Sequence, residues 1–542
     1  MKEISLQIVD ILSDDLPIDN NNNDKYFIIT IYGINTNNER IVCHITKYLP
    51  YFFIKIPNDW EQPIGVKLIK DILGIKPGDN IKDTLFESVK GVQIQICKDF
   101  YGLQWNHNLK NIQLFKYLKI SMQTHDSMKK IITKIKKHYN LENKNKISTK
   151  AKNRLEQWRN TNTSSDCDCN LYESNIHPII RFIHDTKIQP TNWISCKLSS
   201  NEIKTGLFTS CKHEYTSSFK NIHNLSKNDI SHYRIASFDI ECDSSHGDFP
   251  MPKKNFKKTA SDIFDSYQSI LKNISESRRI KFNETMNINL IKLLKGAFTG
   301  NFDNFNSIYK YASVNQIYIQ NNELPTDEIY KLISNKIMNS NIPDNLINLN
   351  IKGKERDSSI NSIQDIINEE CTKINLHVKG DPIIQIGTVF YEFGSNNIKR
   401  HILVISPNDN QDDKDICDDI DTIIVQKCKS EKELLLGWQK IIQQMDPDFI
   451  TGYNIFGFDF KYIYDRAQVL FPCGNRKCKD PYYHVKDCPM KEFLNFGKMN
   501  NIPFKAKDHK SKKCSMKIQR LNSSALGDNT LHYITMDGRI LF

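Results

Sequence analysis

Hydrophobic and polar positions alternate in two separate parts of the chain, and this pattern predicts two strand-rich regions. Near the N-terminus, strand-like runs begin at Tyr26 and Arg40 on either side of the polar turn NTNNE, which predicts a hairpin. Strand-like runs return at 381–393, 401–406 and 421–426, and a helix, the strand DFITGYN and a second helix follow them. This order of strands and helices is typical of an α/β fold.

The segment between about 253 and 379 has a helical period instead. Its apolar residues recur at helical spacing in two groups, Ile263, Phe264, Tyr267, Ile270, Leu271 and Ile274, and then Ile360, Ile363, Ile366 and Ile367. The segment is rich in Asn and contains no motif with recognisable chemistry. We interpret it as a large helical insertion within the second strand-rich region.

Composition narrows the class of protein. A chain of 542 residues with 39% hydrophobic content can bury several cores, so we expect two to four domains. The 74 Lys and Arg residues exceed the 63 Asp and Glu residues, and the net charge of +11 favours an anionic partner such as nucleic acid. The 14 cysteines show no disulfide framework, which predicts a reducing, intracellular compartment. No apolar run reaches the roughly 18 residues of a membrane helix.

Paired carboxylates are the first candidate chemistry. In the strand-like stretch SFDIEC, Asp239 and Glu241 share one face while Phe238 and Ile240 point into the core. Adjacent like charges repel, and a divalent metal such as Mg²⁺ relieves that repulsion. Asp459, in ITGYNIFGFDFKYIYDRA, is a third candidate ligand at the start of a predicted helix. Each motif alone has a simpler explanation, a surface pair or a helix cap, so their combination carries the prediction.

Several ordered motifs together resemble one family. SFDIEC with GDFP, then DPIIQIG, then DPDFITGYNIFGFDFKYIYDRA resemble the first and second exonuclease motifs of family B DNA polymerases, particularly the delta type and its relatives in large DNA viruses. The stretches IYGINTNNERIVCHITKYLPYFFIKIP and YESNIHPIIRFIHDTKIQPTNWI resemble that family's N-terminal domain. The resemblance covers nearly the whole chain. It implies an α/β protein with a β-rich N-terminal domain at 1–232 and a ribonuclease H-like 3′→5′ exonuclease domain at 233–542.

The resemblance also implies roles for particular residues. Asp239, Glu241 and Asp459 would ligate two Mg²⁺ or Mn²⁺ ions, one activating water and the other stabilising the leaving 3′ oxygen. Asn454 and Phe458 would lie near the primer terminus, with Phe458 packing behind Asp459 as the alternative. A single-stranded 3′ end of DNA would be held by stacking and backbone charge.

The last stretch of the sequence, LNSSALGDNTLHYITMDGRILF, resembles the segment that leads to the third exonuclease motif of that family. The third motif and the polymerase palm lie outside the sequence, so we expect the N-terminal portion of a replicative DNA polymerase whose partners are the missing polymerase half and a sliding clamp. A split gene, a disrupted or incompletely read frame, and a free-standing domain without catalysis remain open. The alternative function is an inactive DNA- or partner-binding module. We expect a viral replication site in the host cytoplasm or nucleus.

A possible zinc site follows the second predicted helix. Its four candidate ligands are Cys473, Cys478, His484 and Cys488. The Cys-x4-Cys spacing is looser than that of common zinc knuckles, so zinc is the less favoured interpretation. The basic run KAKDHKSKKC at 505–514 favours a surface loop that contacts DNA phosphates.

Overall fold

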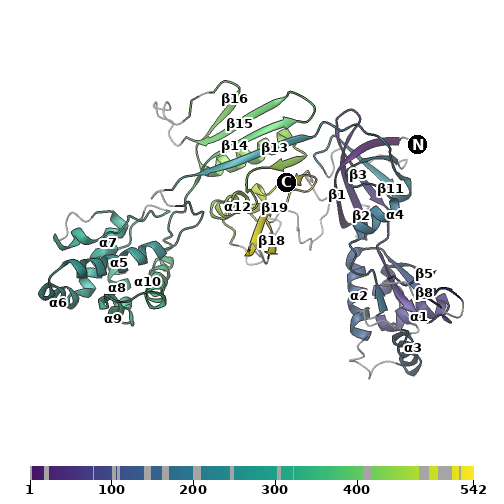
Figure 1. Cartoon of the computed structure of the whole chain (residues 1–542), viewed down its shortest axis with the longest axis horizontal. Helices are drawn as coiled ribbons and strands as arrows, with labels where there is room; N and C mark the ends of the chain where they lie inside the picture. The colour runs from purple at the N-terminus through teal and green to yellow at the C-terminus, as the bar shows by residue number, and fades with distance from the viewer. Residues whose placement is uncertain are drawn as a thin grey trace.

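The computed structural model of the chain describes residues 3–17, 24–76, 78–100, 105–106, 110–139, 148–161, 170–198, 209–244, 249–301, 307–320, 323–406, 417–418, 420–474, 488–498, 516–523 and 527–542. The molecule is elongated, with N-terminal strands at one end, a second set of strands in the middle and a cluster of helices at the other end (Figure 1). None of the helices within these ranges has both the length and the apolar composition needed to cross a membrane.

Six strands form the N-terminal sheet, in the order β11-β3-β2-β1-β10-β12. They are β1 (Glu3–Pro17), β2 (Lys25–Asn35), β3 (Arg40–Thr46), β10 (Trp193–Lys197), β11 (His213–Ser218) and β12 (Ile222–Asn224). β2 and β3 pair antiparallel, which confirms the predicted hairpin. Helix α4 (Pro178–Thr186) packs against this sheet through the buried Phe182.

A second, four-stranded sheet in the order β5-β8-β4-β9 extends from the N-terminal sheet. Its strands are β4 (Tyr51–Ile56), β5 (Val89–Cys97), β8 (Phe115–Met122) and β9 (Leu171–Tyr172). Helices α1 (Gln62–Leu73), α2 (His125–Tyr139) and α3 (Thr149–Arg159) share its apolar core. Short elements connect these parts: β6 (Trp105–Asn106), β7 (Asn111–Ile112), and the 3₁₀ turns Ile81–Asp83, Leu85–Ser88 and Phe219–Asn221.

The central sheet, which we call the carboxylate sheet, has the order β16-β15-β14-β13-β17-β20. Its strands are β13 (Arg234–Cys242), β14 (Ile383–Glu392), β15 (Ile398–Ile405), β16 (Ile423–Cys428), β17 (Phe449–Thr451) and β20 (Ile540–Leu541). β13 pairs antiparallel with β14 and parallel with β17, so the sheet is mixed. This arrangement confirms the predicted α/β class. The boundary predicted after residue 232 lies between β12 and β13 and stays a prediction.

Helix α11 (Glu431–Met445) packs against one face of the carboxylate sheet, and α12 (Asp459–Leu470) reaches the same face through Phe460, whose ring centroid lies 5.4 Å from that of Phe238. Trp438 of α11 is fully buried, its ring centroid lies 4.8 Å from that of Phe238, and its indole nitrogen donates to Thr388 Oγ1 at 3.2 Å. The short helix α13 (Met490–Phe493) and the antiparallel hairpin of β18 (Met516–Ser523) and β19 (Gly527–Ile534) follow in sequence. β13 lies inside the sheet, between β14 and β17, and buried aromatic side chains pack against it.

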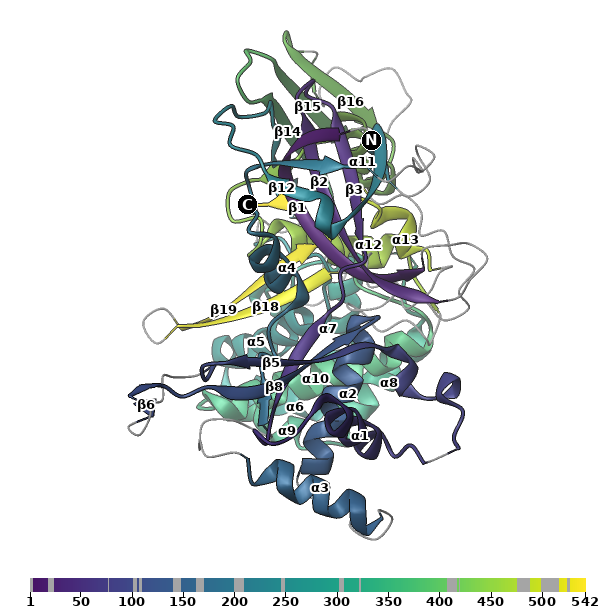
Figure 2. The ribbon, with the colours of Figure 1, turned by 90° about the vertical axis from the view of Figure 1, so that its right-hand side faces the viewer.

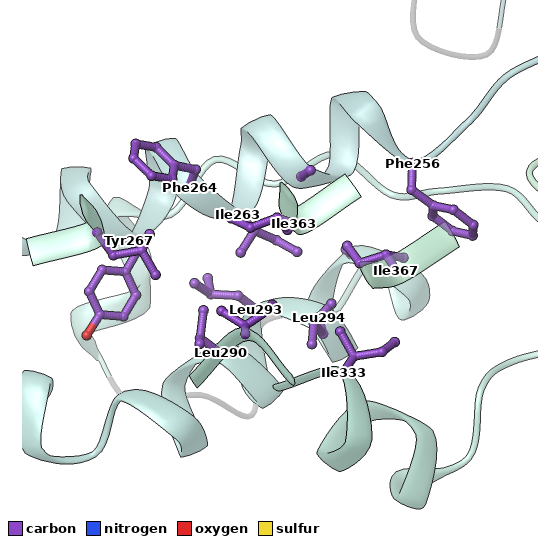
Figure 3. Close-up of a cluster of buried hydrophobic side chains, with 14 of the residues drawn as sticks. Phe256, Ile263, Phe264, Tyr267, Leu290, Leu293, Leu294, Ile333, Ile363 and Ile367 are labelled. Atoms are coloured by element: carbon purple, nitrogen blue, oxygen red, sulfur yellow. The ribbon is translucent and has the colours of Figure 1, made fainter. Parts of the chain in front are cut away.

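The predicted insertion is helical and lies between β13 and β14. Its helices are α5 (Lys257–Asn273), α6 (Glu276–Glu284), α7 (Met286–Thr299), α8 (Asp327–Met338), α9 (Ile342–Ile347) and α10 (Lys354–Lys373), with a 3₁₀ turn at Ser307–Tyr311. Figure 3 shows how their apolar side chains meet, and it labels Phe256, Ile263, Phe264, Tyr267, Leu290, Leu293, Leu294, Ile333, Ile363 and Ile367. The insertion thus has a core of its own.

Candidate active site

Strand β13 presents its two acidic residues on the face of the sheet opposite to its core. Asp239 and Glu241 are exposed, whereas the intervening Phe238 and Ile240 are only 2% and 5% exposed. The alternation follows from strand geometry, in which successive side chains point to opposite faces. Both predicted site residues on this strand are therefore accessible to solvent and to a ligand.

A tight turn after β17 brings the third acid to the same strand. At Gly452 a Cβ atom would lie 2.4 Å from the carbonyl oxygen of Phe238, so only glycine allows this close approach to β13. Asn454 has a positive φ of 52°, and its carbonyl oxygen accepts hydrogen bonds from the backbone N–H groups of Gly457 (2.9 Å) and Phe458 (3.1 Å). The turn ends where α12 begins, at Asp459.

Asp459 is held against the strand that carries the other two acids. Its side chain is buried, with 2% of the residue exposed, and its Oδ1 accepts a hydrogen bond from the backbone N–H of Ile240 at 3.3 Å. Burial raises the pKa of Asp459 to about 6, and the negative charge of Asp239 adds to the increase. Asp239 and Asp459 are therefore electrostatic neighbours, as a shared cation site would require.

The arrangement fits divalent metal through its donor set and its electrostatics. Hard cations prefer carboxylate oxygens, and a bound cation would favour the ionised form of the desolvated Asp459. In the part of the chain that the structure describes, no three His, Cys, Asp or Glu side chains are gathered closely enough to hold a metal ion. Asp239 and Asp459 are the pair in contact, and Glu241 is two residues further along the same face of β13.

Aromatic side chains lie in the segments that flank the acidic motifs. Phe458 is half-buried, and its ring centroid lies 5.2 Å from that of Tyr462 and 5.6 Å from that of Phe249. Phe249 is 76% exposed and Tyr453 is 93% exposed, and the exposed Asn454 lies in the same turn. Sequence reasoning did not single out Phe249 or Tyr453. The sequence features that could have indicated them are the GDFP stretch, which contains Phe249, and the GYN stretch, which contains Tyr453.

A buried ion pair fixes α12 behind the acids. Arg466 donates from Nε to Glu431 Oε1 at 2.8 Å and from Nη2 to Oε2 at 2.5 Å, and both residues are less than 10% exposed. Glu431 Oε1 also accepts from the backbone N–H of Ile383, the first residue of β14, at 2.9 Å. The pair therefore ties α11, α12 and β14 together. Sequence reasoning missed it, because a charged residue in a helix is usually solvated.

The possible zinc site is only partly described. Cys473 and Cys488 both belong to the apolar core beneath the carboxylate sheet, and Cys488 is 4% exposed. Cys478 and His484 lie outside the described residues, as does the basic run 505–514. Zinc binding and phosphate contact by this segment therefore stay predictions.

The fold and the paired acids define an α/β protein with a carboxylate site, and comparison with known proteins adds the family. A family model described as DNA polymerase family B, exonuclease domain, matches residues 169–292 and 308–518, more than half of the chain. The chain therefore belongs to this family.

Similar proteins of the family include viral and cellular polymerases. The DNA polymerase of Pyramimonas orientalis virus is 30% identical over 560 residues, covering 99% of this chain and 40% of the relative. That of Phaeocystis pouchetii virus is 24% identical, covering 96% of this chain and 49% of the relative. The DNA polymerase delta catalytic subunit of Dictyostelium discoideum is 25% identical over 42% of this chain and 19% of its own length. The chain spans less than half the length of these relatives.

Proposed function

We propose that this chain carries the 3′→5′ proofreading exonuclease of a replicative DNA polymerase. The observation that carries the proposal is the position of Asp459, which is buried against the strand of Asp239 and Glu241. Its pKa is raised by burial and by the neighbouring charge of Asp239. Membership of the family supports it independently. The reaction would be hydrolysis of the terminal phosphodiester of a single-stranded 3′ end of DNA.

Each residue of the site has a defined part in this proposal. Asp239, Glu241 and Asp459 would hold two Mg²⁺ or Mn²⁺ ions, which supply an activated water and neutralise charge on the leaving 3′ oxygen. The hydrogen bond from Ile240 fixes the carboxyl of Asp459. The exposed ring of Phe249, packed against Phe458, offers a surface on which a frayed base can stack.

Polymerisation would require further polypeptide. The matched relatives are more than twice as long as the stretch that this chain covers in them, and we propose that the chain works together with the nucleotide-adding half of such a polymerase. A second candidate is a DNA-binding module without catalysis. One observation favours it, since the described residues bring only two of the three acids into contact.

The test is hydrolysis of a 3′-labelled single-stranded oligonucleotide by the whole chain with Mn²⁺, beside the Asp239→Ala variant. Asp357→Ala is the matched control, because it removes an exposed acid from the insertion. We expect Asp239→Ala to lose at least about 100-fold in rate and the control to lose nothing. Binding of Mn²⁺ alone, followed by electron paramagnetic resonance, should weaken in parallel. Equal hydrolysis by wild type and Asp239→Ala would refute the proposal, and equal inactivity would favour the binding module.

A further inference from the structure

The two ends of the helical insertion meet next to helix α12. Figures 1 and 2 both show the insertion helices α5–α10 below the carboxylate sheet, and Figure 1 shows the two segments that connect them to it. The incoming segment follows the exposed ring of Phe249, and the outgoing segment reaches β14 through Asp381. The insertion is therefore attached where the candidate active site is built.

Asp381 is a buried carboxylate that joins the two ends. Only 2% of the residue is exposed. Its Oδ2 accepts from the backbone N–H of Met251 at 2.8 Å, and its Oδ1 accepts from Lys254 Nζ at 2.6 Å. Its carbonyl oxygen accepts from the hydroxyl of Tyr462 in α12 at 3.0 Å. A buried carboxylate requires such partners, so Asp381 fixes the incoming end of the insertion relative to α12.

The incoming end is stiff around Met251. Pro250 and Pro252 fix their own φ angles and restrict the residues before them to extended conformations. Because neither proline has a backbone N–H, the stretch offers a single backbone donor between them, that of Met251, and Asp381 accepts it. Holding Met251 therefore also sets the direction of the chain at Phe249, two residues earlier.

The ring of Phe249 depends on this arrangement, because burial does not hold it. The residue is 76% exposed, and its ring meets that of Phe458 edge to face with 5.6 Å between the centroids. The Phe458 ring lies 5.2 Å, centroid to centroid, from that of Tyr462, whose hydroxyl donates to Asp381. The contacts therefore form a closed series that begins and ends at Asp381.

We propose that Asp381 is a positioning residue for the single-stranded 3′ end: it holds the stiff stretch at Met251 and thereby keeps the Phe249 ring beside Phe458, where a frayed base stacks. The inference deepens the proposed function and rests on it for the substrate. Stacking depends on where the ring lies, so a displaced Phe249 weakens binding of the strand while the acids of the site stay in place. The ends of the insertion thus have a direct part in substrate binding.

The test is steady-state hydrolysis of a 3′-labelled single-stranded oligonucleotide by the whole chain with Mn²⁺, with KM and kcat measured separately. Phe249→Leu should raise KM about 5- to 100-fold and Asp381→Ala at least about 3-fold, with kcat within about 2-fold in both. In the double variant, Asp381→Ala should add less than about 2-fold to the effect of Phe249→Leu, because the aromatic ring is already gone. Asp265→Ala is the matched control, since it removes a carboxylate of α5 that accepts from Arg356 at 2.7 Å, and it should leave KM unchanged.

Pro250→Gly keeps the test independent of the stability of Asp381→Ala. The change leaves the contacts of Asp381 in place and returns backbone freedom between Met251 and Phe249, so it should also raise KM. Additive effects in the double variant, an unchanged KM in Pro250→Gly, or an equal rise in Asp265→Ala would overturn the inference.

A binding measurement separates this inference from the proposed function. The dissociation constants of the same variants for a short 5′-labelled single-stranded oligonucleotide, measured by fluorescence anisotropy in EDTA, should follow the KM values, since stacking requires no metal. If wild type and Asp239→Ala hydrolyse DNA equally, or neither does, while these constants show the same non-additive pattern, the exonuclease proposal fails and the role of Asp381 stands. Activity lost in Asp239→Ala together with additive effects of the other variants would leave the exonuclease proposal in place and overturn this one.

Discussion

Asp448 joins the N-terminal sheet to the carboxylate sheet through a buried ion network, and Asp448→Asn is the most informative test of how the two are held together. The residue is fully buried. Its Oδ2 accepts from Arg40 Nη2 at 2.7 Å and from the backbone N–H of Arg234 at 2.9 Å, and its Oδ1 accepts from Lys498 Nζ at 2.8 Å. Arg40 is the first residue of β3, whereas Asp448 immediately precedes β17.

The expected cost follows from burial and charge. Arg40 and Lys498 are 5% and 1% exposed, so removing the negative charge of Asp448 leaves two cations without their buried counterion. Removing one member of a buried ion pair costs about 3–5 kcal/mol of unfolding free energy. Burial alone would raise the pKa of Asp448, but the charges of Lys498 and Arg40 outweigh it and hold the pKa below its ordinary value. The stabilisation is therefore present above about pH 4 and lost as the pH falls through the lowered pKa.

Urea denaturation of wild type and Asp448→Asn at pH 7 and at pH 3 measures both effects. The difference in unfolding free energy should be about 3–5 kcal/mol at pH 7 and should shrink at pH 3. Asp126→Asn is the control, because Asp126 pairs with Lys130 on the surface with both side chains more than 60% exposed. That change should cost less than about 0.5 kcal/mol. A cost below about 1 kcal/mol for Asp448→Asn, or a difference independent of pH, would refute the reasoning.

Two further predictions concern the acid site and the insertion. Because the folded protein raises the pKa of Asp459 from 3.8 to about 6, this residue should contribute a loss of about 2–3 kcal/mol of stability in the metal-free protein as the pH rises from about 4 to 6. In thermal melts with EDTA, Asp459→Asn should remove this contribution and leave the one of Asp10, whose pKa is also raised to about 6. Leu294→Ala should destabilise the insertion by about 2–5 kcal/mol, since Leu294 is fully buried in its separate core. Hydrogen exchange should then accelerate in α5–α10 while the amides of β13 and β14 keep their protection; faster exchange throughout would contradict a separate core.

Local periodicity explains why much of the fold could be predicted from the sequence. The alternation around Asp239 and Glu241 depends only on extended backbone, and the structure shows the expected exposed and buried positions. The helical faces of the insertion are equally local, and Ile263, Ile270 and Ile363 are all buried in its core. Each of these predictions uses residues within a few positions of one another.

Contacts between distant residues had no such signal. Asp459 reaches Ile240 across 219 positions, and the contact depends on the parallel pairing of β13 with β17 and on the turn at Gly452. Arg40 and Asp448 are 408 positions apart, and nothing near either residue indicates its partner. Pairing and packing across the chain, rather than local pattern, decide these parts.

The insertion follows β13, which ends at Cys242, and its first helix begins at Lys257, so the way its two ends are attached bears on the strand of the paired acids. Met251 and Asp381, at the two ends of the insertion, are joined to each other, and we call these paired ends the stem. The backbone N–H of Met251 donates to Asp381 Oδ2 at 2.8 Å, and the backbone N–H of Asp381 donates to the Met251 carbonyl oxygen at 2.9 Å. Arg466 of α12 donates to the Pro252 carbonyl at 2.9 Å, and a Cβ at Gly380 would lie 2.2 Å from that oxygen. When the two ends of an insertion are held together, the conformational entropy lost on closing it grows only slowly with its length. Arg466 anchors the stem to α12, the helix that begins at Asp459. The helical insertion can therefore be large without changing the positions of Asp239, Glu241 and Asp459 relative to one another.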